Sequence, residues 1–204
     1  PAPTAIPNPN PTASPKPDDR EVPALDGQSP VLANEDNPIP AIFEAVSPSV
    51  VGVVNYTMQS FGGKQMMAIY GSGSGFIVSQ SGYILTNAHV VEDAQAVTVL
   101  LPSGEEIEAA IIGADEETDV AVLKVEHENL KALALGDSDQ VRVGEFVLAI
   151  GNPLDTERLA NTLTYGIISA NSREVTIDSR TNTYLQTDAA INFGNSGGPL
   201  LNLK

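Results

Sequence analysis

The chain has 204 residues, of which 42% are apolar, and this is enough for a packed core and excludes disorder throughout. Its formal net charge of -16, with only ten Lys and Arg residues, argues against nucleic acid and anionic lipid as partners, because both are bound through basic side chains. The absence of cysteine excludes disulfides, thiolate metal sites and a cysteine nucleophile, and no apolar run approaches the roughly 20 residues of a membrane-spanning helix.

The first predicted segment is a disordered Pro-rich linker, residues 1–40. It holds 11 of the 15 prolines and few large apolar side chains, so it cannot bury enough surface to offset its ordering entropy. We expect it to be extended, with polyproline II stretches. Since the sequence shows neither an initiator Met nor a signal segment, we expect a processed or excised piece, and a membrane anchor upstream of residue 1 would suit such a linker.

The folded part begins with a short predicted helix over 41–48, which Pro48 ends. Short runs rich in β-branched residues follow, separated by Gly, Asn and Asp, and one further helical turn is possible at 89–93. Runs at this spacing are typical of a sandwich or barrel, so the predicted fold class is all-β. The predicted strands are 49–57, 75–79, 82–86, 96–101, 106–113, 119–125, 145–151 and 162–170.

A polar connection containing Gly and Asp, residues 132–145, separates two sets of predicted strands. We therefore expect two β-units of unequal length. The first, residues 41–134, would be an N-terminal β-barrel, and the second, residues 135–204, a partial C-terminal β-barrel.

Two histidines could activate a serine nucleophile, since the imidazole pKa lies near neutrality. His127 lies among charges in VEHENL, which is typical of a solvated turn. His89 follows the apolar strand GYILT and has the small Ala88 beside it, so it is the better candidate. A lone histidine is more often structural than catalytic, and the neighbouring residues decide this case.

A carboxylate is needed to orient the imidazole. Asp119 opens the apolar run DVAVLKV and would lie at the edge of the core, where a histidine N–H could pair with it. Asp188 is the second candidate, although its place near the serine suggests that it shapes the turn. Asp93 is too close to His89 along the chain.

The run GNSGG, residues 194–198, is the most specific feature of the sequence. Its glycines allow the strained backbone that lets amide N–H groups converge on one point, as an oxyanion hole requires. We expect Ser196 to be the nucleophile and the backbone N–H groups of Gly194 and Ser196 to be the donors, with Asn195 as a third. A glycine-rich hairpin with an incidental serine is the alternative.

Chain order separates the folds that could carry this motif. The nucleophile elbow of α/β-hydrolases also fits GNSGG, but there the acid and the histidine follow the serine. The order His89, Asp119, Ser196 is that of the chymotrypsin-like double β-barrel, and this agrees with the all-β prediction.

Several long motifs, in the right order, resemble the HtrA/Deg family of trypsin-like serine proteases over roughly residues 41–204. They are GSGFIVSQSGYILTNAHVV (73–91), TDVAVLKV (118–125), GEFVLAIGNP (144–153), TYGIISA (164–170) and QTDAAINFGNSGGPLLN (186–202). The resemblance implies that His89 is the general base, Asp119 its orienting carboxylate and Ser196 the nucleophile.

The resemblance further implies protein quality control outside the cytoplasm, in the periplasm or cell envelope. Its substrates would be unfolded or misfolded chains, cleaved after small aliphatic residues by a serine endopeptidase that forms homotrimers and usually carries a C-terminal PDZ domain. No cofactor and no metal are expected.

Three departures from the family pattern bear on activity. Phe193 stands where the family generally has proline, and LDTERLAN, residues 154–161, replaces a glycine-rich stretch. The strands that follow the serine in the family are absent, so we expect an incomplete second barrel and a longer native protein. The alternative function is therefore a truncated, inactive relative that acts as a peptide-binding or assembly module.

Two other stretches carry weaker signals. GSGSG, residues 71–75, lacks the Lys-Ser/Thr and the helix of a phosphate-binding loop. GADEETD, residues 113–119, lacks the spacing of a calcium-binding loop, and a solvated connection between strands explains it better.

Overall fold

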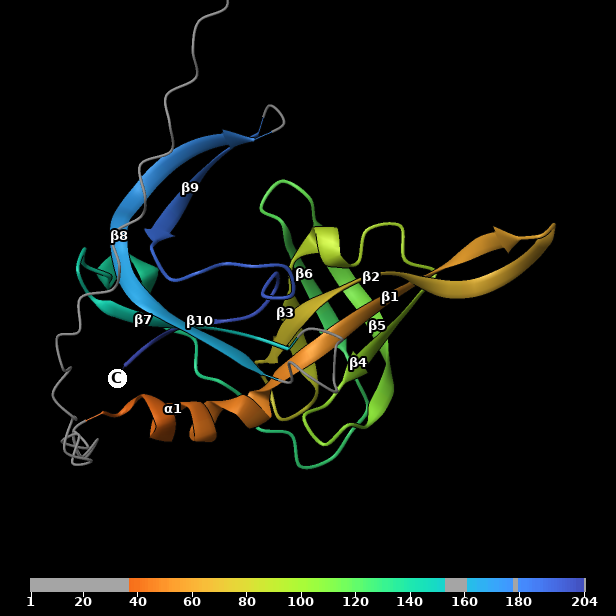
Figure 1. Cartoon of the computed structure of the whole chain (residues 1–204), viewed down its shortest axis with the longest axis horizontal. Helices are drawn as coiled ribbons and strands as arrows, with labels where there is room; N and C mark the ends of the chain where they lie inside the picture. Colours follow the sequence, from red (N-terminus) through yellow and green to blue (C-terminus); the bar gives the residue numbers. More distant parts are fainter. Residues whose placement is uncertain (1–36, 153–160, 178–179, 204) are drawn as a thin grey trace, which may run out of the picture. The chain divides into compact units, whose positions relative to one another are not determined.

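A computed structural model gives the structure of the protein and describes residues 37–152, 161–177 and 180–203. The predicted linker 1–40 lies outside the described residues as far as residue 36, and the stretch 154–161 does so as far as residue 160. The described residues belong to one compact unit, Asn37–Lys204, which contains two β-sheets (Figure 1).

The chain enters the fold through a single α-helix, α1 (Ile39–Val46), followed by the 3-10 turn η2 (Ser47–Ser49). The helix lies two residues earlier than predicted. Pro40 fits within its first turn, where a missing N–H costs nothing, and Pro48 falls in the 3-10 turn instead of ending the helix directly. Within the described residues, no helix has the length and apolar character needed to cross a membrane.

Six antiparallel strands form a closed barrel in the order β1-β2-β3-β6-β5-β4. Pairing of β1 with β4, from Gly52↔Leu100 to Tyr56↔Ala96, closes it. The strands are β1 (Val50–Phe61), β2 (Lys64–Ile77), β3 (Tyr83–Thr86), β4 (Ala96–Leu100), β5 (Glu106–Asp115) and β6 (Val120–Lys124).

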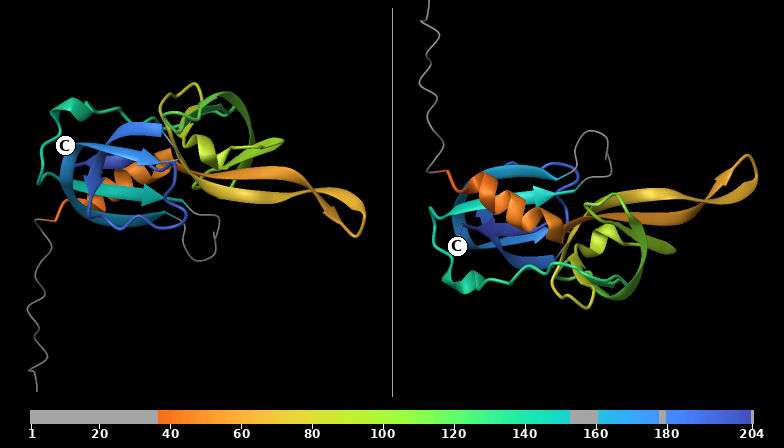
Figure 2. Two further views of the ribbon diagram at one scale, coloured as in Figure 1. Left: turned by 90° about the horizontal axis from the view of Figure 1, so that it is seen from above. Right: turned by 90° about the horizontal axis from the view of Figure 1, so that it is seen from below.

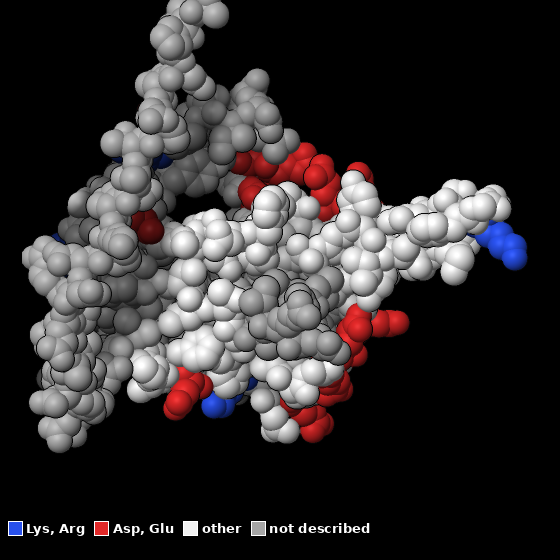
Figure 3. Space-filling model, viewed as in Figure 1, with Lys and Arg blue, Asp and Glu red and all other residues white. Residues whose placement is uncertain are grey.

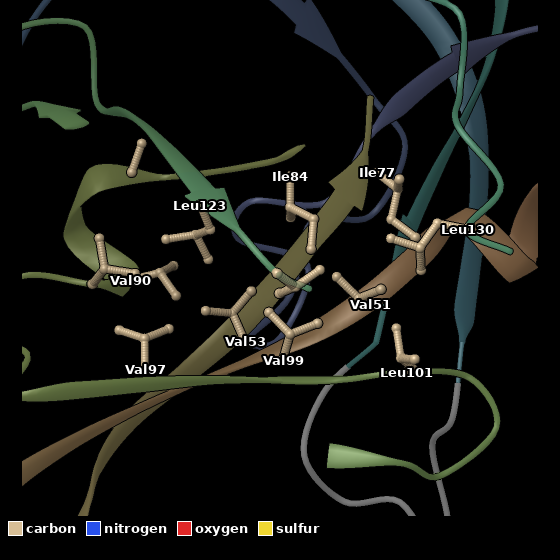
Figure 4. Close-up of a cluster of buried hydrophobic side chains, with 13 residues drawn as sticks. Val51, Val53, Ile77, Ile84, Val90, Val97, Val99, Leu101, Leu123 and Leu130 are labelled. Atoms are coloured by element: carbon tan, nitrogen blue, oxygen red, sulfur yellow. The ribbon is translucent and has the colours of Figure 1, made fainter. Parts of the chain in front are cut away.

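Apolar side chains fill the barrel (Figure 4). Burial alternates along β3, β4 and β6, as expected for strands with one face turned inward. The central members Val53, Ile84, Val99 and Leu123 are completely buried. This core fixes the ends of β3 and β6, which carry the candidate site.

From Tyr56, the last residue at which β1 pairs with β4, the paired strands β1 and β2 extend from the barrel as a long two-stranded arm, residues 56–70 (Figure 2). Gly62 and Gly63 form its turn with φ values of 58° and 81°, which is the backbone that a two-residue hairpin loop of type I′ requires. Exposed apolar side chains cover the arm, namely Met58, Phe61, Met66, Met67, Ile69 and Tyr70.

Charge is distributed unevenly along the chain. Between residues 45 and 91, Lys64 at the arm's turn is the only Lys, Arg, Asp or Glu. Figure 3 shows the same distribution on the visible face, where the arm is white with a basic group at its end and acidic groups lie elsewhere.

The second sheet has four strands in the order β10-β7-β8-β9. These are β7 (Phe146–Gly151), β8 (Thr162–Ile177), β9 (Arg180–Thr187) and the short β10 (Leu200–Asn202). In the described residues this sheet is open, and it buries Val147, Leu148, Ile150 and Ile168. The prediction of an all-β, chymotrypsin-like fold with an incomplete second barrel is confirmed.

Candidate active site

His89 lies in the 3-10 turn η3 (Ala88–Val90), directly after β3. Its neighbours Ala88 and Val90 are buried in the barrel, and this holds the turn in place while the His89 side chain remains 53% exposed. Asn55 on β1 adds a second restraint, because its side-chain amide donates to Val90 O at 3.2 Å and to Glu92 O at 2.8 Å.

Asp119 ends the turn between β5 and β6 and has φ of 56°, a left-handed conformation that Asp tolerates better than most residues. Its carboxylate lies 2.8 Å from His89 Nδ1 through Oδ2 and 3.1 Å through Oδ1. The same Oδ1 accepts the backbone N–H of His89 at 2.9 Å. The Asp119 side chain is 40% exposed, so the expected burial of this carboxylate is only partial.

The Asp119 backbone is tied to the histidine segment as well. Its carbonyl oxygen accepts the backbone N–H of Ala88 at 3.2 Å and the side-chain amide of Asn87 at 2.8 Å. Four hydrogen-bond donors from residues 87–89 therefore converge on one aspartate, and the position of the imidazole is fixed relative to β6.

The contact with Asp119 selects one tautomer of His89. An ionised carboxylate can only accept hydrogen bonds, so Nδ1 carries the proton. In the neutral ring Nε2 is then left with a free lone pair. Such an imidazole can accept a proton at Nε2 while the carboxylate stabilises the cation that results.

Ser196 lies in a compact turn between β9 and β10. The turn is closed by hydrogen bonds from Asn195 N–H to Asn192 O at 3.1 Å and from Gly198 N–H to Asn195 O at 2.8 Å. Gly194 and Gly197 have φ values of 103° and 83°, which a residue with a side chain adopts only under strain. The glycine spacing of GNSGG is thus required by this backbone.

The turn packs directly on the first barrel. The backbone N–H of Ser74 on β2 donates to Ser196 O at 2.7 Å. At Gly197 there is no room for a side chain, since a Cβ atom would collide with Ser74 O and Thr86 Oγ1 and lie 3.0 Å from Asn87 N. Ser196 is therefore next to a residue that contacts the segment 86–87, which leads directly into His89.

Within the described residues, no hydrogen bond joins His89 Nε2 to Ser196 Oγ. The three residues of the predicted triad thus form one hydrogen-bonded pair, His89 and Asp119, with Ser196 half-buried in the adjoining turn.

The predicted oxyanion donors differ in how their N–H groups are used. The N–H of Asn195 donates to Asn192 O within the turn, and this argues against a role as donor to a substrate oxygen. The carbonyl end of the Asn195–Ser196 peptide accepts Gly198 N–H, so the orientation of the Ser196 N–H is set by the turn. The N–H groups of Gly194 and Ser196 remain the candidates.

The other titratable candidates have structural partners. Asp188 accepts the backbone N–H of Ile167 at 2.7 Å, which ties the residue after β9 to β8. The expectation that Asp188 shapes the serine turn stays a prediction. His127 lies 3.3 Å from Glu105 through Nε2, and its side chain is only 29% exposed, so it is less solvated than predicted. In the part of the chain that the structure describes, no three acidic or histidine side chains cluster as metal ligands would.

Sequence reasoning missed Asn87, which binds Asp119 O, and Ser74, which binds the serine turn. Ser74 lies both in the family motif 73–91 and in the stretch GSGSG, but neither pattern predicts a contact with the serine turn. It lies within β2, where Gly73 and Gly75 let the strand approach its neighbours closely.

The chain is similar in sequence to known proteins. The family described as trypsin-like peptidase domain matches residues 73–204. The protein named serine protease HhoB in Synechocystis sp. is 55% identical over 137 residues, covering 66% of this chain and 32% of HhoB. The protein named periplasmic serine endoprotease DegP-like in Halomonas elongata is 54% identical over 131 residues, covering 64% of this chain and 27% of that protein.

A protein of the same name in Ectopseudomonas mendocina is 52% identical over 143 residues, which is 70% of this chain and 29% of that protein. The chain thus spans about a third of the length of the curated relatives that it matches.

Proposed function

Because the chain belongs to the trypsin-like peptidase family, and within it to the HtrA/Deg serine proteases, we propose that it is the protease domain of a serine endopeptidase. In this proposal His89, Asp119 and Ser196 form the catalytic triad. The contact between His89 Nδ1 and the Asp119 carboxylate is the observation that carries it.

Two features support the inclusion of Ser196. Gly197 packs against Asn87, two residues before His89, so the serine turn and the histidine turn are neighbours. Ser196 is also only half-buried and the His89 side chain is exposed, which leaves both accessible to a polypeptide substrate. In this proposal a hydrogen bond between Ser196 Oγ and His89 Nε2 forms when substrate binds, since such contacts often tighten only in the complex.

Acylation follows from this arrangement. Ser196 Oγ attacks the carbonyl carbon of the scissile peptide while His89 Nε2 removes its proton. The charge on the imidazole is stabilised by Asp119, and the negative charge on the substrate oxygen is stabilised by the N–H groups of Gly194 and Ser196. His89 then protonates the leaving amine.

Deacylation reverses the roles. A water molecule attacks the acyl-enzyme ester, His89 accepts the proton of that water, and the proton returns to Ser196 Oγ as the acid product leaves. Each step uses only the three side chains and two backbone amides, and no cofactor or metal ion enters the reaction.

The substrate class and cellular location are proposed from the relatives. Two of them are named as periplasmic serine endoproteases. By analogy with them we propose that this protein acts outside the cytoplasm. The resemblance to the HtrA/Deg family motifs is what suggests unfolded or misfolded proteins as its substrates, in protein quality control. A homotrimer is the proposed assembly, and sedimentation velocity of the protein would test it.

The alternative is a catalytically inactive member of the family that binds peptides or mediates assembly. One observation favours it, namely that no hydrogen bond joins His89 Nε2 to Ser196 Oγ in the described part of the chain. The presence of the intact His89–Asp119 pair favours the protease.

Covalent labelling with a fluorophosphonate probe separates these functions. We expect an adduct on Ser196, located by peptide mass spectrometry, that disappears in His89→Ala and persists in His127→Ala. A folded chain that gives no adduct would overturn the protease assignment in favour of the binding module. Cleavage of an unfolded protein such as reduced casein, lost in Ser196→Ala, would then establish endopeptidase activity.

A further inference from the structure

Six polar residues are buried among the described residues, and four of them lie in or next to the serine turn. Ser74 is completely inaccessible to solvent, and it is hydrogen-bonded to two of the others, Thr86 and Asn152. The four residues are Ser74, Thr86, Asn152 and Asn195. A buried hydroxyl must find hydrogen-bond partners, so the partners of Ser74 show what it holds in place.

Each polar atom of Ser74 has a partner. Its N–H donates to Ser196 O at 2.7 Å, its carbonyl accepts from Thr86 Oγ1 at 2.7 Å, and its Oγ accepts the backbone N–H of Asn152 at 2.7 Å. The hydroxyl also contacts Gly194 O in a short hydrogen bond. One residue of the barrel thus contacts both ends of the Gly194–Ser196 segment and the end of β7.

The direction of the hydroxyl proton follows from these contacts. The N–H of Asn152 can only donate, so it occupies a lone pair of Ser74 Oγ. The carbonyl of Gly194 can only accept, so the Ser74 proton must point toward it. The hydroxyl therefore has one defined orientation, and it fixes the Gly194–Asn195 peptide plane from the carbonyl side.

The other end of that peptide plane is fixed by Asn195 N–H donating to Asn192 O. The next plane, Asn195–Ser196, is held by Gly198 N–H, and the plane after Ser196 is held by the Ser74 N–H. The three peptide planes on which the position of Ser196 depends are therefore all restrained, and Ser74 supplies two of the restraints.

We propose that the Ser74 hydroxyl is a positioning residue for the nucleophile, which sets the Gly194–Asn195 peptide and thereby the placement of Ser196 Oγ and of the oxyanion donors. The proposal rests on the protease function argued above. Ser74 does not touch substrate. A displacement of a reacting group by about 1 Å can lower the reaction rate on the order of 100-fold. The loss of this buried hydrogen bond should therefore lower the rate at which Ser196 reacts as well as the stability of the fold.

The test compares Ser74→Ala with Ser49→Ala. Ser49 is also buried, and among the described residues no hydrogen bond joins its side chain to the serine turn, so it controls for the loss of a buried hydroxyl. Fluorophosphonate labelling of Ser196 is measured as a second-order rate constant over a range of pH, well below the melting temperature of each variant. Hydrogen exchange of the peptide that covers residues 192–198 is followed by mass spectrometry.

We expect Ser74→Ala to label about 10- to 100-fold more slowly than the unaltered chain, with the same midpoint in its pH profile because the His89–Asp119 pair is untouched. Exchange in 192–198 should be faster, and Ser49→Ala should change neither quantity. Equal slowing in both variants, or a normal labelling rate in Ser74→Ala, would overturn the proposal. Ser74→Cys, which keeps the side-chain shape and a weak donor but has the larger sulfur atom, serves if Ser74→Ala does not fold, and an intermediate rate is expected.

The two proposals fail in different ways. If the unaltered, folded chain is not labelled at all, the protease function fails. The exchange measurement then tests the role of Ser74 by itself. Faster exchange of residues 192–198 in Ser74→Ala, but not in Ser49→Ala, would support the proposal that Ser74 restrains the serine turn, and unchanged exchange would overturn it.

Discussion

The carboxylate of Asp119 accepts hydrogen bonds from two separate groups of His89, the ring Nδ1 at 2.8 Å and the backbone N–H at 2.9 Å. The first contact sets the tautomer and the second sets the position of the carboxylate itself. An aspartate that was only an ion-pair partner would not need the backbone contact. The pair is therefore a rigid unit, although it lies at the surface.

Asp119→Asn removes the negative charge beside His89 and keeps an oxygen that can accept the His89 backbone N–H. An NH2 group facing Nδ1, however, favours the tautomer that protonates Nε2, so the ring can no longer act as base. We expect labelling of Ser196 and peptide cleavage to fall on the order of 10³- to 10⁴-fold with little change in melting temperature. Wild-type rates in this variant would contradict the role given to Asp119, and His127→Asn is the control.

Gly197→Ala should be far more destabilising than Gly104→Ala. Both glycines have positive φ, at 83° and 86°, so each substitution carries a similar backbone strain of about 1–2 kcal/mol. At Gly104 a Cβ atom meets nothing within 4 Å, whereas at Gly197 it collides with Ser74 O and Thr86 Oγ1. Urea unfolding should show an excess loss of about 1–3 kcal/mol for Gly197→Ala, and equal losses would refute the tight packing of the turn.

Leu123→Ala measures the contribution of the barrel core. Leu123 is completely buried in the cluster shown in Figure 4, so its truncation should lower the free energy of unfolding by about 2–5 kcal/mol. Leu135, which is 68% exposed, is the matched control, and Leu135→Ala should change stability by less than about 0.5 kcal/mol. Comparable effects from both would mean that the core is placed wrongly.

Glu106 should make the free energy of unfolding depend on pH in the acid range. Thr98 and Tyr56 donate hydrogen bonds to its Oε1, and these, with the Thr98 bond the larger, lower the pKa of Glu106 below its ordinary value of 4.5. A lowered pKa means that the contribution is fully present above pH 4.5 and is lost as pH falls through the folded-state pKa. The difference in stability between wild type and Glu106→Gln should therefore shrink below pH 4.5, and a pH-independent difference would exclude this linkage.

Alternation of apolar side chains made β3, β4 and β6 predictable, because one face of each strand points into the barrel. The arm was missed beyond Thr57, since its residues are exposed on both faces and carry no such alternation. The Gly62-Gly63 pair was the available signal, as a two-residue turn between strands. Strands β9 and β10 were not predicted, because β9 is largely polar and β10 has three residues.

The candidate site was predictable to a different degree. Spacing and residue type were sufficient to pair His89 with Asp119, and the role of Ser196 stays a prediction until it is labelled. The part played by Ser74 was not accessible, because its hydroxyl contacts a carbonyl 120 residues away and nothing local in the sequence indicates that pairing. The boundaries of the two β-units, 41–134 and 135–204, also stay predictions.

The apolar arm, in which Lys64 is the one charged residue, has a consequence for the colloidal behaviour of the protein. At neutral pH the net charge of -16 makes the molecules repel one another, and this keeps the exposed methionines and aromatic rings of residues 56–70 apart. Salt shortens the range of that repulsion to about 8 Å at physiological ionic strength, and acidification toward the isoelectric point near 4.2 removes it. Self-association through the arm thus depends on charges that lie elsewhere on the molecule. It should be weakest in dilute, low-salt buffer at neutral pH.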